Sequence, residues 1–342
     1  MRDDDDMRPD GLPNVVTLRR WRSVHELDTG SRMIGLDPTA ALVVDDLAPA
    51  LAELIPELRS PVTPAEFAAR AGARGVAAQD AYALLGALHT AGELVDGAAL
   101  QRAKNHRAAA AVVVQGTGPL TVGVAVGLVA AGIGAVRVVT SGTVTGADLG
   151  TGLGDADRGR PRLAAIGDAA ARVAPGTTVT SRPRTLVPDL VVLADEYPDP
   201  VTVDDLLATG LAHLPVRLRD GIGVVGPLVL PGRTACLSCL DLQRSACNPN
   251  WPMVAAQLAG RRGEADPACA QATAALAVAQ VTAAIDATAG GTAPPPALEA
   301  SIELDAASAT IVRRTWLAVP DCRCRATELL RAQPGGGATI VG

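Results

Sequence analysis

The sequence predicts an α/β protein in which a small α+β domain precedes a larger domain built around parallel strands. Residues 109–114 are a short apolar run, the pattern of a strand buried on both faces, and residues 136–139 predict the next buried strand. A glycine-rich turn and an apolar helix over residues 120–131 lie between them, and Gly132 stands where a helix C-cap falls. Sequential parallel strands joined by a helix form a right-handed crossover unit. Residues 13–100 instead show short strands followed by helices.

The segment over residues 13–100 predicts a winged-helix-like α+β domain. Thr63, Pro64 and Glu66 have the form of a capping box that begins a helix, with proline in its first turn. Apolar spacing predicts one helix before this one and another after it, and a short strand follows Gly92. The predicted strands are residues 15–16, 33–36, 41–44 and 94–95, and the outer helices cover residues 47–55 and 77–90.

A winged helix commonly binds DNA, but the third helix of this one is a poor reader of bases. Residues 77–90 contain neither Arg nor Lys, and basic residues carry most contacts in the major groove. A DNA-binding regulator is therefore the less favoured interpretation. Such a domain can instead accept a peptide as an added strand. A third interpretation is a small domain that only packs on the larger one.

The glycine turn after the first buried strand loosely satisfies a dinucleotide-binding pattern. Gly116, Gly118 and Gly123 supply the glycines, although the third comes late. In this arrangement backbone N–H groups and the helix dipole face a phosphate. Pro119 lacks one of those N–H groups, and Thr140 stands where an acidic residue normally holds a ribose. The pattern predicts a nucleotide-type fold with a weak or lost nucleotide site.

Residues 189–194 predict a further strand that ends at Asp195. Ligands of open α/β sheets bind beyond such strand ends, so Asp195 is a candidate contact for a metal–phosphate group. Its other interpretation is a cap on a helix or turn. Later elements are strands over residues 216–219 and 223–230, an alanine-rich helix over 267–288, and a hairpin from 302–304 and 310–316.

Four of the six cysteines form two close pairs. Cys236 and Cys239 are separated by two residues, and Cys322 and Cys324 by one. Four thiolates can complete a tetrahedral Zn²⁺ site with no open position, which would be structural. A redox dithiol or unpaired thiols are the alternatives. The remaining two, Cys247 and Cys269, are expected to be free buried thiols, with a nucleophilic role for Cys247 as the less favoured alternative.

Composition argues against binding to nucleic acid or to an anionic membrane. The net charge is −6, and the longest apolar run, residues 122–136, is broken by glycines and too short to span a bilayer. The chain opens with an acidic run rather than a secretory signal, so the protein is expected in the cytoplasm. Residues 1–12 are expected to form an acidic disordered tail, and residues 331–342 a flexible one.

The N-terminal domain resembles the PqqD-like leader-peptide recognition domain of ribosomal peptide biosynthesis. The likeness rests on Ile34-Gly35-Leu36-Asp37, on the helix entry from Leu58 to Phe67, and on the run from Leu85 to Asp96. The resemblance implies a peptide groove between the edge formed by residues 33–36 and the third helix. The expected peptide-binding residues are Arg32, Ile34, Leu36, Tyr82 and Leu85, with Arg32 able to pair with an acidic leader.

Residues 105–330 look like the ThiF/MoeB-type activating-enzyme fold. The matching features are the glycine turn, the run from Ala131 to Val136, Asp195 and the paired cysteines. That family uses ATP to adenylate a C-terminal carboxylate. Here Gly150-Thr151 replaces its Arg-Gln after Asp148-Leu149, and its phosphate-binding lysine has no counterpart. Arg160, or Arg158, is the nearest substitute, so bound ATP–Mg²⁺ is not expected.

Nearly the whole chain resembles the ThiF-like partner protein of the azole-forming cyclodehydratases. The run from Val224 to Asp241 and the run from Val319 to Cys324 carry this likeness. The resemblance implies a non-catalytic scaffold that binds a precursor leader peptide and presents the precursor to a YcaO-type protein, which makes thiazoles or oxazoles. Homodimerisation is expected by analogy with ThiF-like folds. The alternatives are an active adenylyltransferase and a DNA-binding regulator.

Overall fold

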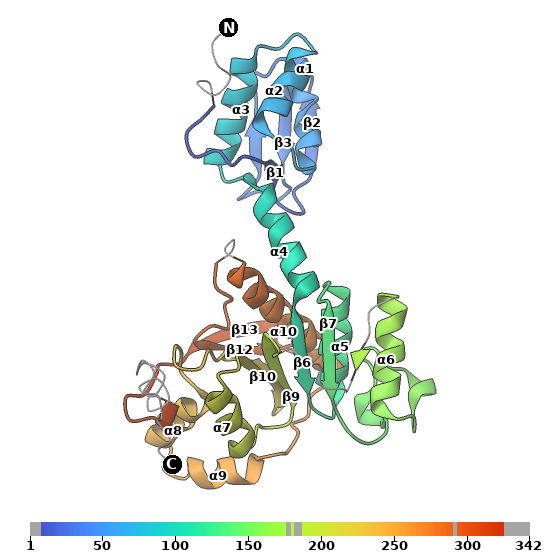
Figure 1. The fold of residues 1–342 in the computed structure, drawn as a ribbon, viewed down its shortest axis with the longest axis vertical. Coiled ribbons are helices and arrows are strands. Elements are labelled where there is room, and N and C mark those ends of the chain that lie inside the picture. The colour runs from blue at the N-terminus through green and yellow to red at the C-terminus, as the bar shows by residue number, and fades with distance from the viewer. Residues whose placement is uncertain (1–7, 176–178, 181–186, 290–292, 325–342) are drawn as a thin grey trace, which may run out of the picture. The chain divides into compact units, whose positions relative to one another are not determined.

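The computed structural model describes residues 8–175, 179–180, 187–289 and 293–324 (Figure 1). The chain divides into two compact units, the first ending at Ala103 and the second beginning at Lys104. The predicted tail over residues 331–342 lies outside the described residues, as do residues 1–7 of the N-terminal one. The N-terminal tail was predicted too long, because Leu12 is buried in the core of the first unit.

The first unit contains two small antiparallel sheets. One sheet has the strand order β2-β3-β4, so that β3 is central and β2 and β4 are its edges. The other pairs β1 with β5, with Val16 opposite Asp96. The bounds are β1 Val16–Leu18, β2 Val24–Asp28, β3 Ser31–Ile34, β4 Leu42–Val44 and β5 Leu94–Asp96. The sequence missed β2, whose residues are mostly polar and whose register with β3 is irregular.

The helices of the first unit follow its three-stranded sheet and close its core. The predicted capping box is present: Thr63 Oγ1 accepts from Glu66 N–H, and Glu66 accepts from Thr63 N–H. Phe67, Ile34 and Leu85 are fully buried between these helices and the sheets. The bounds are α1 Pro49–Ala52, η2 Ile55–Arg59, α2 Pro64–Gly72 and α3 Ala78–Thr90.

A helix that the sequence did not predict follows the first unit's last strand. This is α4, Gly97–Ala109, which spans the boundary between the two units. It buries only Gly97 and Ala103. Because helices are recognised mainly by an apolar stripe, a helix with so few buried side chains gives little signal.

The second unit is built on one eight-stranded mixed sheet, with the order β13-β12-β11-β10-β9-β6-β7-β8. Its strands from β10 to β8 are parallel, and β11, β12 and β13 add antiparallel strands to that block. This arrangement fits the ThiF/MoeB-type Rossmann-like fold. The bounds are β6 Ala111–Gln115, β7 Ala135–Val139, β8 Val179–Thr180, β9 Leu190–Asp195, β10 His213–Arg219, β11 Ile222–Val225, β12 Ala300–Asp305 and β13 Thr310–Thr315.

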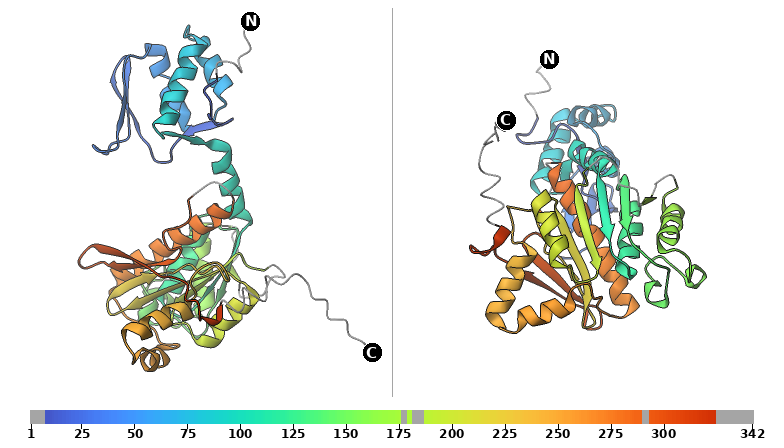
Figure 2. Two further views of the ribbon diagram at one scale, coloured as in Figure 1. Left: turned by 90° about the vertical axis from the view of Figure 1, so that its left-hand side faces the viewer. Right: turned by 60° about the horizontal axis from the view of Figure 1, so that its bottom comes forward.

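Helices cover both faces of this sheet (Figure 2). On one face, Val192 of β9 joins a core with α5 and α10, and on the other Val191 joins a smaller core with Leu206 of α7. Successive strand residues point to opposite faces, which explains why this strand is apolar throughout. The bounds are α5 Pro119–Ala130, α6 Arg162–Val173, α7 Pro200–Thr209, α8 Leu237–Cys247, α9 Trp251–Leu258 and α10 Pro267–Thr288.

The helix α10 is apolar and long enough, by length and composition alone, to cross a membrane. Ten of its residues are nevertheless buried within the second unit. Ala274 and Val278 lie where any Cβ added to Gly123 and Gly127 of α5 would meet them, at 2.7 Å in both cases. This close packing identifies α10 as a core helix of the folded unit.

The direction of chain progression across the sheet reverses between β6 and β9. Along the parallel block, β7 and β8 lie on one side of β6, and β9 and β10 lie on the other. Open α/β sheets bind ligands at such a switch point, beyond the carboxyl ends of the strands. The glycine turn after β6 and Asp195 at the end of β9 are both at this position.

Candidate functional site

The glycine turn lies directly against the end of β9. A Cβ on Gly116, whose φ is +157°, would lie 2.2 Å from the carbonyl oxygen of Ala194. A Cβ on Gly118 would lie 2.5 Å from a carboxylate oxygen of Asp195. Glycine is therefore required at these two positions by the close approach of the chain itself.

Asp195 occupies the N-terminus of α5. Its φ of +70° is tolerated better by Asp than by most residues, and its carboxylate accepts four hydrogen bonds. The donors are the N–H groups of Gly118, Leu120 and Thr121, each at 2.9 Å, and the Thr121 hydroxyl at 2.6 Å. Asp195 is 4% exposed. It therefore caps α5, the second of the two interpretations that the sequence left open.

This cap uses the donors that a phosphate would need. Phosphates bind helix N-termini through free backbone N–H groups and the positive end of the dipole. Gly118, Leu120 and Thr121 already donate to Asp195, and Pro119 between them has no N–H. The anion position at α5 is thus filled by a carboxylate of the chain.

Two other residues predicted to bind a nucleotide lie in different surroundings. Gly123 is within α5, where it permits the close packing of α10. Arg160 forms ion pairs with Asp157, at 2.6 Å, and with Asp168. Its guanidinium is thus engaged within its own segment, so its predicted role at phosphate is not supported.

A second buried charge lies beside the turn. Asp148 is fully buried and accepts from Thr145 N–H at 2.7 Å and from Arg162 at 3.1 Å. Arg262 lies 3.9 Å from the other oxygen of Asp148 and donates to the carbonyl of Thr117 at 2.8 Å. The buried charge of Asp148 is therefore balanced by arginines of this chain.

Glu196 closes the opposite side of the turn. Its carboxylate accepts from the Thr117 hydroxyl, and burial raises its pKa above the usual range. A cavity of ≈330 Å³ lies alongside, lined by Glu196, Thr140 and the glycine turn among others. Thr140 Oγ1 is buried without a hydrogen-bond partner among the described residues.

Two further cavities that the sequence did not predict lie beyond the ends of β9 and β10. Their volumes are ≈420 and ≈410 Å³, and both are lined by Tyr197, Arg217 and Arg244. Tyr197 donates to Asp241 at 2.9 Å, and burial, with that carboxylate, raises the pKa of Tyr197 to about 12. The residues that line these cavities come from the end of β9 and the segment after it, from β10, from α7, α8 and α9, and from the segment after α9. Sequence spacing does not relate these elements.

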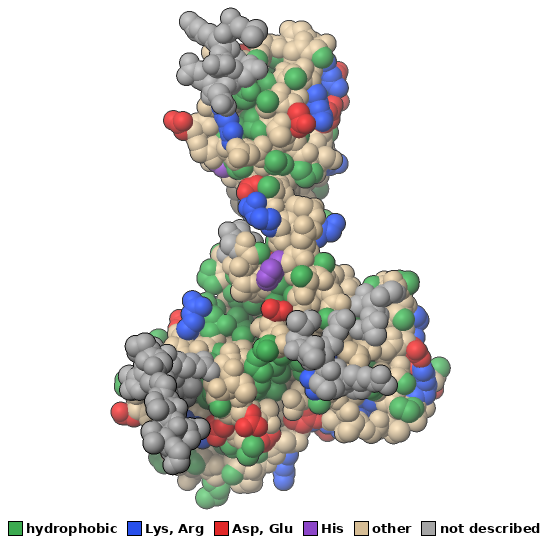
Figure 3. All heavy atoms as spheres, in the orientation of Figure 1, with side chains coloured by type: hydrophobic (Ala, Val, Ile, Leu, Met, Phe, Trp, Pro, Cys, Tyr) green, Lys and Arg blue, Asp and Glu red, His purple; other side chains and the backbone are tan. Residues whose placement is uncertain are grey.

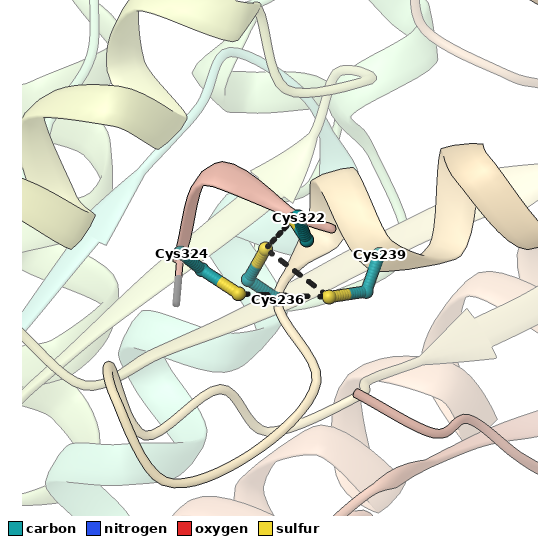
Figure 4. A group of neighbouring side chains, drawn as sticks. All are labelled: Cys236, Cys239, Cys322 and Cys324. Carbon is teal, nitrogen blue, oxygen red and sulfur yellow. Dashed lines mark hydrogen bonds between the residues drawn. The ribbon is translucent and has the colours of Figure 1, made fainter. Parts of the chain in front are cut away.

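The four predicted metal ligands converge on one point (Figure 4). Their Sγ atoms all lie within 4.8 Å of one another, and all four residues are buried. The Sγ of Cys236 is 3.8 Å from that of Cys239 and 3.6 Å from that of Cys322, and Cys239 and Cys324 are 3.6 Å apart. A tetrahedral Zn²⁺ with bonds of about 2.3 Å requires sulfur–sulfur distances of about 3.8 Å. The cluster is thus compatible with a metal site.

The surroundings of the cysteines favour one thiolate and disfavour two others: the hydrogen bond with Cys239, together with burial, raises the pKa of the Cys236 thiol, and burial raises the pKa of the Cys324 thiol. The Cys236 thiol and the N–H of Val319, 3.4 Å away, hydrogen-bond to Cys239 Sγ and lower the pKa of that thiol to about 4. The ligands join α8 to the segment after β13, and Trp316 and Leu240 pack around them. Cys269 is buried as predicted, but Cys247 is exposed at the end of α8 because it does not face this core.

The predicted peptide-binding residues do not form an open groove. Ile34, Tyr82 and Leu85 are 0–3% exposed and belong to the core of the first unit. Arg32 is also buried and donates to the carbonyls of Asp28, at 2.7 Å, and Ser31. Of the five, only Leu36 is exposed. The predicted edge is wrong as well, because β3 is paired on both sides and offers no free backbone.

No protein-family model matches the sequence, and no curated protein matches it. Solved structures do match. One of E. coli MccB with the peptide MccA has a TM-score of 0.66 at 16% identity, covering 91% of this chain and 99% of that one.

The chain has the fold of MccB. A structure described as the microcin C7 biosynthetic enzyme MccB with N-formylated MccA has a TM-score of 0.67 at 14% identity, covering 91% of this chain and 99% of that one. A structure of E. coli MccB with ATP has a TM-score of 0.66 at 15% identity, covering 90% of this chain and 98% of that one. The likeness extends over both units and is one of fold.

Proposed function

We propose that this protein binds the leader of a ribosomal precursor peptide and presents the precursor to a YcaO-type cyclodehydratase that forms thiazoles or oxazoles. The proposal joins two observations: the MccB-like fold, which in MccB accommodates a precursor peptide, and the filled anion position at α5. The capping of α5 by Asp195 carries the argument for a scaffold. A protein that binds peptide but not ATP must leave the ATP-dependent step to a partner.

The first unit is the proposed leader-binding part, with β4 as the edge that accepts the peptide. Strand addition needs an edge with free backbone N–H and C=O groups. Of the two edges, β2 has a register shift between Glu26 and Asp28 and carries acidic side chains, features that protect an edge. The edge β4 pairs regularly with β3 and exposes Val43 by 47%, and Leu36 nearby in sequence is 67% exposed. These two side chains replace the predicted buried set.

A DNA-binding role has little support in the charges of the protein. The helix α3 has no Arg or Lys. On the face shown in Figure 3, acidic and basic side chains are interspersed over both units. Nucleic-acid-binding surfaces instead concentrate basic side chains on one face.

The cysteine cluster is proposed to hold a structural Zn²⁺. Four sulfur ligands leave no position for water or substrate. Arg323, next to two of the cysteines, pairs with Asp204 of α7 at 2.7 Å. The ion would therefore fix the segment after β13 against α7 and α8, beside the two cavities.

An adenylating enzyme is the second candidate, and the fold likeness to MccB with ATP favours it. Against it stand the cap by Asp195, the unpaired Thr140 and the ion-paired Arg160. Each removes a contact that a nucleotide would need, so the scaffold is the better supported function.

One experiment separates the two. The full chain is mixed with ATP–Mg²⁺ and the precursor encoded beside its gene, and ³²P-pyrophosphate exchange is measured. The scaffold predicts no exchange above the rate without peptide. Exchange that requires the peptide and saturates with ATP would establish the adenylating enzyme instead.

A further inference from the structure

Arg217 is a buried cation without a direct ion-pair partner among the described residues. It is 6% exposed, and among the described residues its guanidinium has neither a hydrogen bond nor an ion pair. Its contact is the ring of Tyr197, whose centroid lies 5.1 Å away. Burying a charge without a partner is costly, so the chain maintains this arginine at the expense of stability.

The neighbouring charges do not balance Arg217. The carboxylate of Asp241 already accepts from Tyr197 and from Trp251, each at 2.9 Å, and lies 3.6 Å from Arg244. Two guanidinium groups therefore share one carboxylate that is already occupied. Burial, with the charge of Arg244, lowers the pKa of Arg217 to about 10, so it remains charged at neutral pH.

Arg217 lines both of the cavities at the ends of β9 and β10, and the two differ in chemistry. The cavity over α7 and α8 is mainly apolar, with Val203, Leu237 and Leu240 among its lining residues. The other contains further arginines together with acidic groups, including Asp220 and Glu264. An apolar group fits the α7–α8 cavity. A singly charged anion fits beside Arg217, which lines both cavities.

We propose that Arg217 binds a carboxylate of the peptide held by this protein, with a neighbouring aliphatic side chain in the α7–α8 cavity. A guanidinium pairs well with a planar carboxylate. The acidic residues of the second cavity disfavour a more highly charged phosphate. The assignment of the carboxylate to a peptide rests on the proposed function, and the carboxylate can be the C-terminus or an acidic side chain.

Indole N–H signals provide the test, because the chain has three tryptophans. Trp251 lines the cavity that contains Asp220 and Glu264, and Trp21 is in the first unit. N-acetyl-leucine carries the carboxylate and the aliphatic side chain, and N-acetyl-leucinamide carries the side chain alone. In ¹H–¹⁵N spectra of the full chain, the acid should shift the Trp251 signal saturably and leave Trp21 in place. The amide should bind at least about 10-fold more weakly.

The matched variants are Arg217→Met and, as control, Arg233→Gln, which changes an exposed arginine outside both cavities. Arg217→Met should lose at least about 10-fold in affinity for the acid while melting no lower than wild type, because it removes an unpaired buried charge. Arg217→Lys, which keeps the charge, should retain part of the affinity. Arg233→Gln should bind as wild type.

Three results would overturn the proposal: no saturable shift of Trp251 in wild type, equal binding of acid and amide, or unchanged binding by a folded Arg217→Met. An equal response to inorganic phosphate would show a general anion site and reject the carboxylate assignment. N-acetyl-aspartate amide, set against N-acetyl-leucine, distinguishes a side-chain from a terminal carboxylate. Because these probes need no leader, failure of leader binding by the first unit would not change the outcome.

Discussion

The carboxylate of Asp195 lies 2.9 Å from the backbone nitrogen of Thr121 and 2.6 Å from its hydroxyl oxygen. These contacts join the end of β9 to the first turn of α5 across the switch point of the sheet. They place a negative charge at the positive end of a helix, which is stabilising. The same contacts leave that end without free donors for a phosphate.

Asp195→Ala should therefore lower the stability of the protein. The change removes a buried charge–dipole interaction and leaves three N–H groups without their acceptor, with an expected loss of about 2–3 kcal/mol. Calorimetric melting measures the effect. Asp155→Asn, at a side chain 85% exposed, is the control and should melt as wild type. An Asp195→Ala protein that melts as wild type would show that the cap contributes nothing.

Cys239→Ser should release the metal and destabilise the protein together. We expect about one Zn²⁺ per wild-type chain and a melting temperature lower by on the order of 10 °C in the variant, because metal binding is linked to folding. Elemental analysis and melting measure both. Cys247→Ser, at an exposed cysteine outside the cluster, should change neither. Absence of zinc from wild type purified without chelator would reject the site.

Stability should fall in mild acid through His213. This residue is fully buried in β10, and burial lowers its pKa. The unfolded chain, with an ordinary His pKa near 6.5, then binds more protons than the folded one. Stability is therefore retained above about pH 6.5 and lost below it, by up to about 1.4 kcal/mol per pH unit.

Melting curves between pH 7.5 and 5.5 measure this dependence. His213→Leu removes the titrating group, so its melting temperature should change less over this range than that of wild type. If wild type and His213→Leu lose stability in parallel, the acid sensitivity arises elsewhere.

Local signals predicted the elements that carry strong patterns. The capping box at Thr63 and Glu66 specifies its own geometry, and it is present. The helix α10 was predicted with its observed bounds because Pro267 marks a start and an apolar pattern follows. The strands β6, β7 and β9 were found within one or two residues, since their cores are runs of apolar residues dominated by valine and leucine. The cysteine spacing likewise predicted a cluster that the fold assembles.

Features that depend on the partner of a residue were not predictable. Asp195 has the same identity whether it contacts a metal–phosphate or caps a helix, and only the proximity of Gly118 decides. The central position of β3 follows from β2, which lacks a clear strand pattern. Arg217 alternates with apolar neighbours like any half-exposed strand residue, and its surroundings include α8 and α9, which follow β10 only after further elements of the chain.

Fluorescence polarisation of the labelled leader against the full chain tests the proposed leader-binding role and its location on β4. Val43→Asp places a charge on the β4 edge, and Leu27→Asp places one on β2 at a side chain of similar exposure, 52% against 47%. We expect saturable binding by wild type, a loss of at least about 10-fold for Val43→Asp, and no change for Leu27→Asp. Failure of wild type to bind the leader, or wild-type affinity in a folded Val43→Asp protein, would contradict this assignment.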